Sequence, residues 1–188
     1  MRVSLSRTAL TPLIQELGAG IGLASIAAAR LGCRVFATDG SPTSVGLLED
    51  NFRTNLPDEG GDGGPTTIRP RASMLEWGDM DSADGLVRKD ILSLPDVIMA
   101  SDVVYLRSAR RELADTIRRL CPDGHLRGRV VVAHRWRTDT MTDTADEASF
   151  FEEFDGEFDR EEVAAELLPE GYNTRAGDVS VFVMKRKH

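Results

Sequence analysis

The stretch that most constrains the fold is a glycine-rich turn at residues 16–22, Glu-Leu-Gly-Ala-Gly-Ile-Gly. It follows the apolar pair Leu13-Ile14 and leads into an Ala-rich segment, residues 23–31. This order predicts a strand, a tight turn and a helix. Glycines at the carboxyl end of a strand let the backbone come close to a ligand, and the helix start behind them offers free N–H groups. The sequence therefore predicts a site that cradles a cofactor.

The residues around the turn favour a cationic cofactor over a dinucleotide. A dinucleotide fingerprint needs a third small residue three positions after its second glycine, where this chain has Leu23. Glu16, just before the turn, would repel a pyrophosphate and suits a positive charge. S-adenosylmethionine carries an ammonium and a sulfonium group, so we expect it as the cofactor. The alternative is an ordinary strand–helix crossover with a glycine turn.

A second carboxylate follows the next predicted strand. Residues 34–38 read as a strand that ends in Asp39, twenty-one residues after Gly18. A carboxylate at that strand end can accept hydrogen bonds from both ribose hydroxyls of a nucleoside. Its alternative role is that of a cap. Together, Glu16 and Asp39 strengthen the prediction of a cofactor site.

Polar residues that follow two later strands are the candidates for the reaction side. Residues 96–100 form a short apolar run typical of a buried central strand, and Asp102 and Tyr105 come soon after it. In open α/β sheets ligands bind at this edge. Asp102 has the alternative of a loop cap and Tyr105 that of a half-buried aromatic. His134, after the strand predicted at 128–133, is a further candidate for substrate contact, although a structural histidine is commoner.

The rest of the chain alternates between predicted helices and strands. Ser41-Pro42 predicts the start of a helix that runs to about Asn55, and Ser108 the start of one that ends at Leu120. The pattern Thr144-x-x-Glu147 is a capping box and predicts another helix. Further predictions are a helix at about 20–31, strands at 68–75 and 179–184, a mobile surface loop at 58–65, and a segment at 158–168 that is ambiguous between strand and helix. Four arginines of the helix at 108–120 are expected to face water: Arg110, Arg111, Arg118 and Arg119.

Composition and charge exclude several classes of protein. A chain of 188 residues with 41% apolar content suits one domain, residues 1–188. The formal charge of −8 argues against binding to nucleic acid phosphates and fits a basic or peptide-like partner, or merely solubility. Cys33 and Cys121 have neither the spacing of a zinc site nor that of a disulfide framework, so no metal is expected. The sequence shows no apolar run of membrane-spanning length and no leader pattern, so we expect the protein in the cytoplasm, or also in the nucleus. We also expect a monomer.

Four motifs occur in a recognisable order: the glycine turn at 16–22, the acidic strand end at Asp39, Leu-Glu-Trp-Gly at 75–78, and Ala-Ser-Asp-Val-Val-Tyr at 100–105. From residue 13 onward the chain resembles the seven-strand, class I S-adenosylmethionine-dependent methyltransferases. Within them it is similar to the methyltransferase-like proteins of family 16, which modify lysine in other proteins. The glycine motif is shared by many methyltransferases, whereas the tryptophan motif together with Asp-x-x-Tyr is far more selective.

The resemblance implies a Rossmann-like α/β fold with a seven-stranded, mostly parallel sheet, helices on both faces and an antiparallel last strand. That topology favours a strand for residues 158–164. It also implies site roles. Gly18, Ala19 and Gly20 would hold the methionine part of the cofactor, with Glu16 and Gly22 completing the motif. Asp39 would hold the ribose and Ala100 would form the cofactor floor, while Asp102 and Tyr105 would lie at the reaction side. Trp77 would flank the adenine, although from the residues alone a core side chain is the commoner role for it.

The resemblance further implies N-methylation of lysine in a protein substrate. The alternatives are an arginine-directed relative and a protein that keeps the fold without catalysis, while a dehydrogenase that uses NAD is disfavoured by Leu23 and Glu16. One departure is that the family usually has a longer segment before the glycine motif, with a tryptophan that helps to cover the cofactor. This sequence has no counterpart, so we expect a truncated start or a more open cleft.

Overall fold

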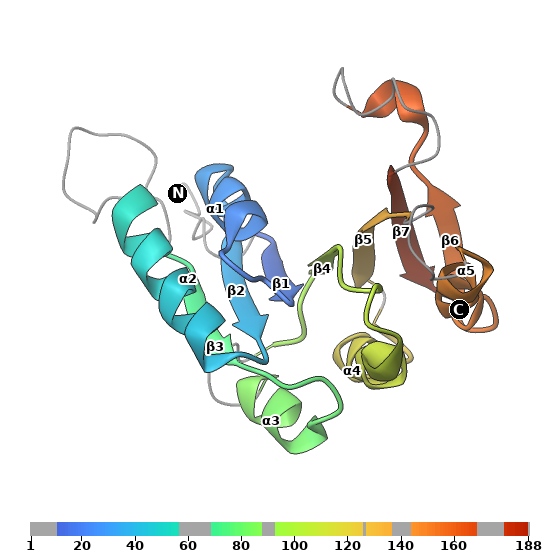
Figure 1. Ribbon diagram of the computed structural model, residues 1–188, viewed down its shortest axis with the longest axis horizontal. Coiled ribbons are helices and arrows are strands. Elements are labelled where there is room, and N and C mark those ends of the chain that lie inside the picture. Colours follow the sequence, from blue (N-terminus) through green and yellow to red (C-terminus); the bar gives the residue numbers. More distant parts are fainter. Residues whose placement is uncertain are drawn as a thin grey trace, which may run out of the picture.

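The computed structural model describes residues 11–56, 69–87, 93–125, 127–136, 144–168 and 179–187. Its centre is a seven-stranded sheet in the order β3-β2-β1-β4-β5-β7-β6, which runs from left to right in Figure 1. The strands are β1 (Leu13–Leu17), β2 (Arg34–Asp39), β3 (Arg71–Met74), β4 (Val97–Ser101), β5 (Arg129–Arg135), β6 (Phe158–Glu162) and β7 (Val179–Arg186). Neighbours among β1 to β5 pair in parallel, and β7 pairs antiparallel with both β5 and β6. The predicted fold class is confirmed.

Helices cover both faces of the sheet. They are α1 (Leu23–Arg30), α2 (Pro42–Asn55), α3 (Met80–Gly85), α4 (Arg110–Leu120) and α5 (Thr144–Glu152), with single turns η3 (Arg107–Ala109) and η4 (Ala165–Leu167). Side chains alternate between the faces of a strand. In β2, Val35 and Ala37 belong to one core cluster with α1 and α2. Phe36 belongs to a larger cluster with α3, α4 and α5. The sheet thus separates two apolar layers.

Local signals explain most helix boundaries. Ser41 caps α2 by accepting a hydrogen bond from the Ser44 backbone, and Pro42 occupies the first turn, as predicted. The first helix begins at Leu23 and not near Gly20, because Gly22 has a φ of +82° and so cannot belong to a right-handed helix. The strand predicted at 68–75 is shorter than expected, and residues 158–162 form a strand, β6. The loop predicted at 58–65 lies outside the described residues.

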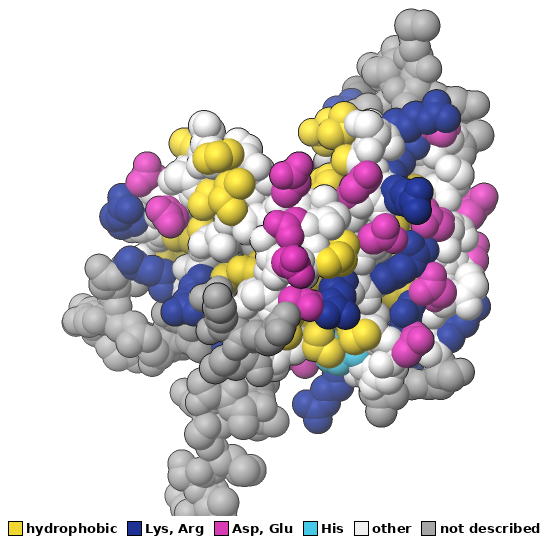
Figure 2. Space-filling model, turned by 90° about the horizontal axis from the view of Figure 1, so that it is seen from below, with side chains coloured by type: hydrophobic (Ala, Val, Ile, Leu, Met, Phe, Trp, Pro, Cys, Tyr) yellow, Lys and Arg dark blue, Asp and Glu magenta, His cyan; other side chains and the backbone are white. Residues whose placement is uncertain are grey.

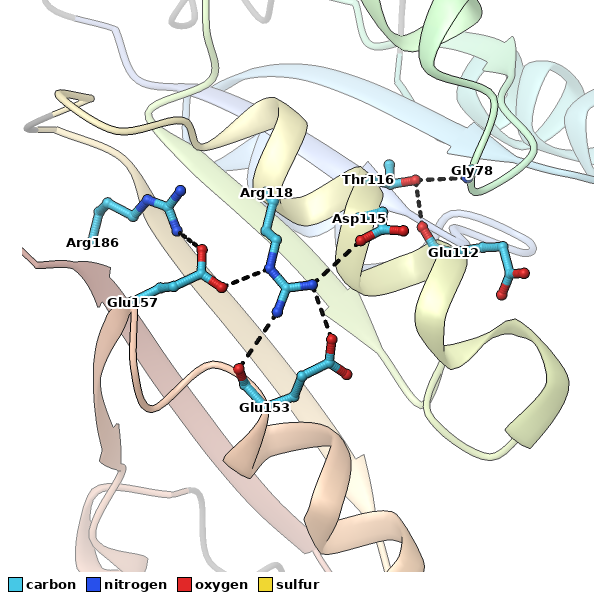
Figure 3. Close-up of polar contacts among 8 residues, drawn as sticks. All are labelled: Gly78, Glu112, Asp115, Thr116, Arg118, Glu153, Glu157 and Arg186. Carbon is cyan, nitrogen blue, oxygen red and sulfur yellow. Dashed lines mark hydrogen bonds and ion pairs between the residues drawn. The ribbon is translucent and has the colours of Figure 1, made fainter.

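The expectation that all four arginines of α4 face water is wrong for Arg110, which is only 8% exposed. For Arg118 the expectation is only partly right, because its side chain is 23% exposed and also has carboxylate partners. That guanidinium makes ion pairs with Glu153 at 3.0 Å and Glu157 at 2.8 Å, and Glu157 in turn pairs with Arg186 (Figure 3). These contacts tie α4 to the end of α5 and to β7. The helical periodicity of a sequence shows which face of one helix is polar. It cannot predict ion pairs with distant segments of the chain.

Among the residues that the structure describes, no helix has the length and apolar character that crossing a membrane requires.

Gly22 and Gly46 provide a matched pair of substitutions. A Cβ at Gly22 would lie 2.5 Å from Leu48 Cδ2 and 3.0 Å from Phe52 Cε1, at a positive φ. We expect Gly22→Ala to lower the free energy of unfolding by about 2–4 kcal/mol, from strain plus overpacking. Gly46 lies within α2 with open space around it, so Gly46→Ala should raise it by up to about 1 kcal/mol. Urea unfolding measures both, and an unaffected Gly22→Ala protein would contradict the packing described.

Candidate active site

Three parallel strands end at the same place. Leu17, the last residue of β1, lies beside Thr38 of β2 on one side and Ala100 of β4 on the other. Each strand is therefore followed at that edge by a segment with predicted site residues. β1 also stands at the point where the strand order reverses, with β2 and β3 on one side and β4 and β5 on the other. In open α/β sheets this is the place where ligands bind.

A cleft of about 790 Å³ lies at this edge, within the size range of small-molecule sites. Its described lining contains four carboxylates and no basic side chain. Figure 2, which looks at the molecule from below, shows acidic side chains in a column across the middle of the face. The strands β1 and β2 point toward this face in Figure 1. The lining comprises Gly18, Gly20, Asp39, Gly40, Ser41, Ser44, Glu76, Trp77, Asp102, Val103, Tyr105, Leu106, Ser108, Ala109 and Glu112.

The glycine turn forms one wall of the cleft. A Cβ at Gly18 would lie 2.9 Å from both Trp77 Cζ2 and Val103 Cγ1, so only a glycine lets the indole and the valine pack against the backbone there. The Gly20 N–H donates to Asp39 Oδ2 at 2.9 Å. The Ala19 N–H donates to the Thr38 carbonyl, also at 2.9 Å. The turn is thus held on the end of β2.

Asp39 joins the glycine turn to the start of α2. Its Oδ2 accepts from the Gly20 N–H, and its Oδ1 accepts from the Ser41 N–H, each at 2.9 Å. A carboxylate oxygen has two acceptor positions, so these contacts leave capacity for a ligand hydroxyl on each oxygen. Asp39 also lines the cleft. Its position therefore allows the role that the sequence predicts for it.

The segment after β3 is fixed by α4. The Gly78 N–H donates to Thr116 Oγ1 at 2.9 Å, and that hydroxyl donates to the Glu112 carbonyl at 2.8 Å (Figure 3). Trp77, next to Gly78, is partly buried against the larger core cluster and lines the cleft. The indole is therefore both a core side chain and a wall of the site.

Asp102 and Tyr105 lie in the loop after β4. Asp102 has a φ of +54°, and its N–H donates to the Ala133 carbonyl of β5 at 2.8 Å. Val103 and Val104 point into the core and are 4% and 0% exposed, whereas Tyr105 is 54% exposed. The buried valines thus hold Asp102 and Tyr105 at the cleft from inside the protein.

The structure brings together most of the predicted site residues but not all. Gly18, Gly20, Asp39, Trp77, Asp102 and Tyr105 line the cleft. Ala19 and Ala100, which are 8% and 1% exposed, and Gly22, packed against Leu48 and Phe52, lie behind the lining. These three shape the site without forming its surface.

Glu16 is turned away from the cleft lining. It is 3% exposed, and its Oε2 accepts a hydrogen bond from the Ser25 hydroxyl of α1. Burial raises the pKa of the Glu16 carboxyl, although the Ser25 hydrogen bond acts in the opposite direction. The sequence argument correctly places an acid before the turn, but the side chain joins β1 to α1, and Glu16 is not part of the described lining of the cleft.

His134 is a structural histidine, the commoner of the two roles considered for it, and is not part of the described lining of the cleft. Its side chain is 0% exposed, and Nε2 lies 3.1 Å from the Glu147 carboxylate of α5, which is equally buried. The histidine therefore serves the contact between β5 and α5. Within the described part of the chain, no group of three or more potential ligands could hold a metal ion.

The sequence argument missed several lining residues. The sequence identifies Ser41 only as the start of a helix, and Glu76 only as part of the Leu-Glu-Trp-Gly motif. Glu112 carries no local signal, because helix packing alone brings α4 to the cleft. The others missed are Gly40, Ser44, Val103, Leu106, Ser108 and Ala109.

Comparison with known proteins relates this chain to lysine methyltransferases, both by a family model and by individual relatives. The model of a family described as lysine methyltransferase matches residues 6–157. The protein-lysine methyltransferase METTL21E of Mus musculus is 32% identical over 80% of this chain and 54% of its own length. The EEF1A lysine methyltransferase 3 of the same species is 31% identical over 69% of this chain and 47% of its own length. The chain thus spans about half the length of these relatives.

Solved structures share the fold at low sequence identity. A TehB-like SAM-dependent methyltransferase from Corynebacterium glutamicum aligns with a TM-score of 0.59 and 15% identity, over 96% of this chain and 84% of its own. The magnesium protoporphyrin IX methyltransferase from Synechocystis, solved with bound SAM, aligns with a TM-score of 0.58 and 16% identity, over 94% and 71%. These likenesses bear on the fold alone.

The buried Glu16 carboxyl gives a testable pH dependence. Because its pKa is raised in the folded state, the folded protein keeps a proton that the unfolded chain releases just above pH 4.5. Its contribution to stability is present below that pH and is lost as the pH rises through the raised pKa. Glu16→Gln removes this titration. We expect the free energy of unfolding of the wild type, minus that of the variant, to fall as the pH rises above about 4.5, by at most about 1.4 kcal/mol per pH unit. Urea titrations at several pH values measure it, and a constant difference would contradict the assignment.

Proposed function

Because this chain belongs to the family of lysine methyltransferases, whose model matches residues 6–157, we propose that it transfers a methyl group from S-adenosylmethionine to a lysine side chain of another protein. The observation that carries the proposal is the cleft at the strand ends. It is lined by Asp39, Glu76, Asp102 and Glu112 and has no basic side chain among its described lining. The sulfonium donor is positively charged, and the lysine side chain is positively charged until it loses a proton. An acidic cleft therefore attracts both reactants.

The donor site is proposed at the glycine turn. The Gly18–Gly20 backbone would hold the methionine part, Asp39 would accept from the ribose hydroxyls, and Trp77 would flank the adenine. The fit is supported by the close packing that a Cβ at Gly18 would disrupt and by the remaining acceptor capacity of Asp39. When bound, the donor supplies an electrophilic methyl carbon on a positively charged sulfur.

The acceptor site is proposed at Asp102 and Tyr105. Methyl transfer needs no nucleophilic residue of the protein, because the acceptor amine itself attacks. The protein contributes by placing that amine in line with the methyl carbon, a proximity effect of up to roughly 7–11 kcal/mol. A free lysine has a pKa of about 10.4, so it must lose a proton before it reacts. Asp102 would accept a hydrogen bond from the amine and orient it, and Tyr105 would form a wall of the acceptor channel.

Two alternatives remain within the same fold. An arginine-directed enzyme would use the same donor site and differ only in the acceptor. A binding protein without catalysis would keep the fold but transfer no methyl group. A dehydrogenase is disfavoured because Leu23 stands where the dinucleotide fingerprint needs a small residue.

Donor binding is tested by calorimetry with S-adenosylhomocysteine and with NAD. We expect S-adenosylhomocysteine to bind and NAD not to bind. Asp39→Asn removes a charged acceptor, so it should weaken binding about tenfold or more. Asp50→Asn, on the exposed face of α2, is the control and should bind as the wild type does. Binding of NAD alone, or unchanged affinity in Asp39→Asn, would contradict the donor site.

Acceptor chemistry is tested by transfer of labelled methyl groups to proteins of a cell extract, followed by mass spectrometry of the modified residue. Asn tolerates the positive φ of position 102. We therefore expect Asp102→Asn to fold and to bind S-adenosylhomocysteine normally, because that product carries no sulfonium charge. Transfer should fall at least about 100-fold. Methylation of arginine would favour the first alternative, and a fully active Asp102→Asn enzyme would refute the role of Asp102.

A further inference from the structure

The loop that carries Asp102 and Tyr105 is held at both ends. At its start, the Asp102 N–H donates to the Ala133 carbonyl of β5 at 2.8 Å. Near its end, the carbonyl of the buried Val104 accepts from Arg110 Nε at 2.7 Å. A peptide group is planar, so fixing the Val104 carbonyl also fixes the N–H of Tyr105. Arg110 therefore controls the direction in which Tyr105 leaves the core.

Arg110 differs from its neighbours in α4. It is the first residue of the helix and is 8% exposed, whereas the adjacent Arg111 is exposed. Its Nη1 donates both to the Asp146 backbone carbonyl at 2.9 Å and to Asp146 Oδ2 at 2.7 Å. The other oxygen of Asp146 lies 3.3 Å from Arg107 Nη2. One buried guanidinium thus joins the loop after β4 to helix α5.

Helix α5 is itself fixed to β5. Glu147, next to Asp146, contacts the buried His134 at 3.1 Å. His134 directly follows Ala133, which accepts from Asp102. The contacts therefore form a closed circuit from Asp102 through β5 and α5 to Arg110 and back to Tyr105. An apolar side chain at position 110 would fill the same space, but only a forked donor reaches a backbone carbonyl and a carboxylate together.

We propose that Arg110 is a positioning residue for the acceptor side of the reaction. It holds Tyr105 and Asp102 at the cleft through Val104, and it leaves the donor site to the glycine turn and Asp39. This inference rests on the proposed function, since it names which part of that site Arg110 serves. A displacement of about 1 Å in such a loop costs on the order of 100-fold in rate.

Three variants and one control test the proposal. Arg110→Met keeps the apolar bulk and removes every donor. Arg110→Lys keeps the charge but cannot serve Val104 and Asp146 at once. Asp146→Asn weakens the α5 end alone. Arg111→Met changes the exposed neighbour and is the control. Each is assayed for S-adenosylhomocysteine affinity, for labelled methyl incorporation into extract proteins, and for hydrogen–deuterium exchange of the amides of residues 102–106.

The expected result is a graded one. Donor affinity stays within about twofold of the wild type in all four proteins, because the glycine turn and Asp39 are held by β1 and β2. Methyl incorporation falls most in Arg110→Met, by up to about 100-fold, and less in Arg110→Lys and Asp146→Asn. Amide exchange in the loop speeds up in the same order. Arg111→Met matches the wild type in every measurement.

Unchanged exchange and unchanged incorporation in Arg110→Met would overturn the proposal. If that variant fails to fold, Arg110→Lys and Asp146→Asn decide it: normal donor binding with reduced incorporation supports it, and wild-type incorporation overturns it. Loss of donor binding in all three variants also overturns it, because Arg110 would then serve the whole fold. If the wild type methylates no protein, the proposed function fails, but the exchange measurement still shows whether Arg110 holds the loop.

Discussion

The site depends on the parallel alignment of β1, β2 and β4. Their register places Leu17 between Thr38 and Ala100, so the three strands end at the same edge of the sheet and the segments that follow them begin there. Parallel strands require long crossovers, and the crossovers here carry the helices that cover both faces. The glycine turn, Asp39 and the loop after β4 reach the cleft because of this alignment, whereas the packing of α4 brings Glu112 to it. A shift of one residue in the register would turn Asp39 toward the opposite face and separate it from the glycine turn.

The carboxylates of the cleft come from different parts of the chain and do different work. Asp39 accepts hydrogen bonds from the backbone N–H groups of Gly20 and Ser41, and these contacts fix the shape of the proposed donor side. Glu76, Asp102 and Glu112 arrive from three further segments. Like charges in one cleft repel each other, and a cationic ligand relieves that repulsion. Glu16 lies outside the lining, and its pKa is raised by burial, against the effect of its hydrogen bond from Ser25.

Among the described residues, no basic side chain lines the cleft, and two arginines lie behind it. Arg110 is buried beneath the loop after β4, and Arg118 lies between α4, α5 and β7. Both guanidinium groups have carboxylate partners, so their charge is neutralised where it is buried. Arginines that the sequence pattern assigns to the polar face of α4 thus link this helix to neighbouring elements. Their role depends on the carboxylates that other elements bring to them.

Much of the fold was predictable from sequence. The apolar runs, the glycine turn, the Ser41-Pro42 cap and the order of motifs predicted the parallel sheet, its helices and the edge where the site lies. The sequence also placed Asp39, Asp102 and Tyr105 at the cleft, because strand ends in such a sheet converge, and the family resemblance added Trp77. It failed for Arg110, because that position allows either a solvent-facing or a buried role, and for His134 it left a structural role and a substrate contact both open.

The sequence by itself therefore determined which backbone edge forms the site and which acids follow its strands, since local periodicity and turn chemistry act within a few residues. Only the tertiary structure decided the direction of each side chain. It turned Glu16 toward Ser25, brought Glu112 to the cleft from α4, and placed Arg110 between Val104 and Asp146. The reason is physical: a side chain takes the partner that packing supplies, and that partner can lie far away in the chain, as Asp146 lies 36 positions from Arg110.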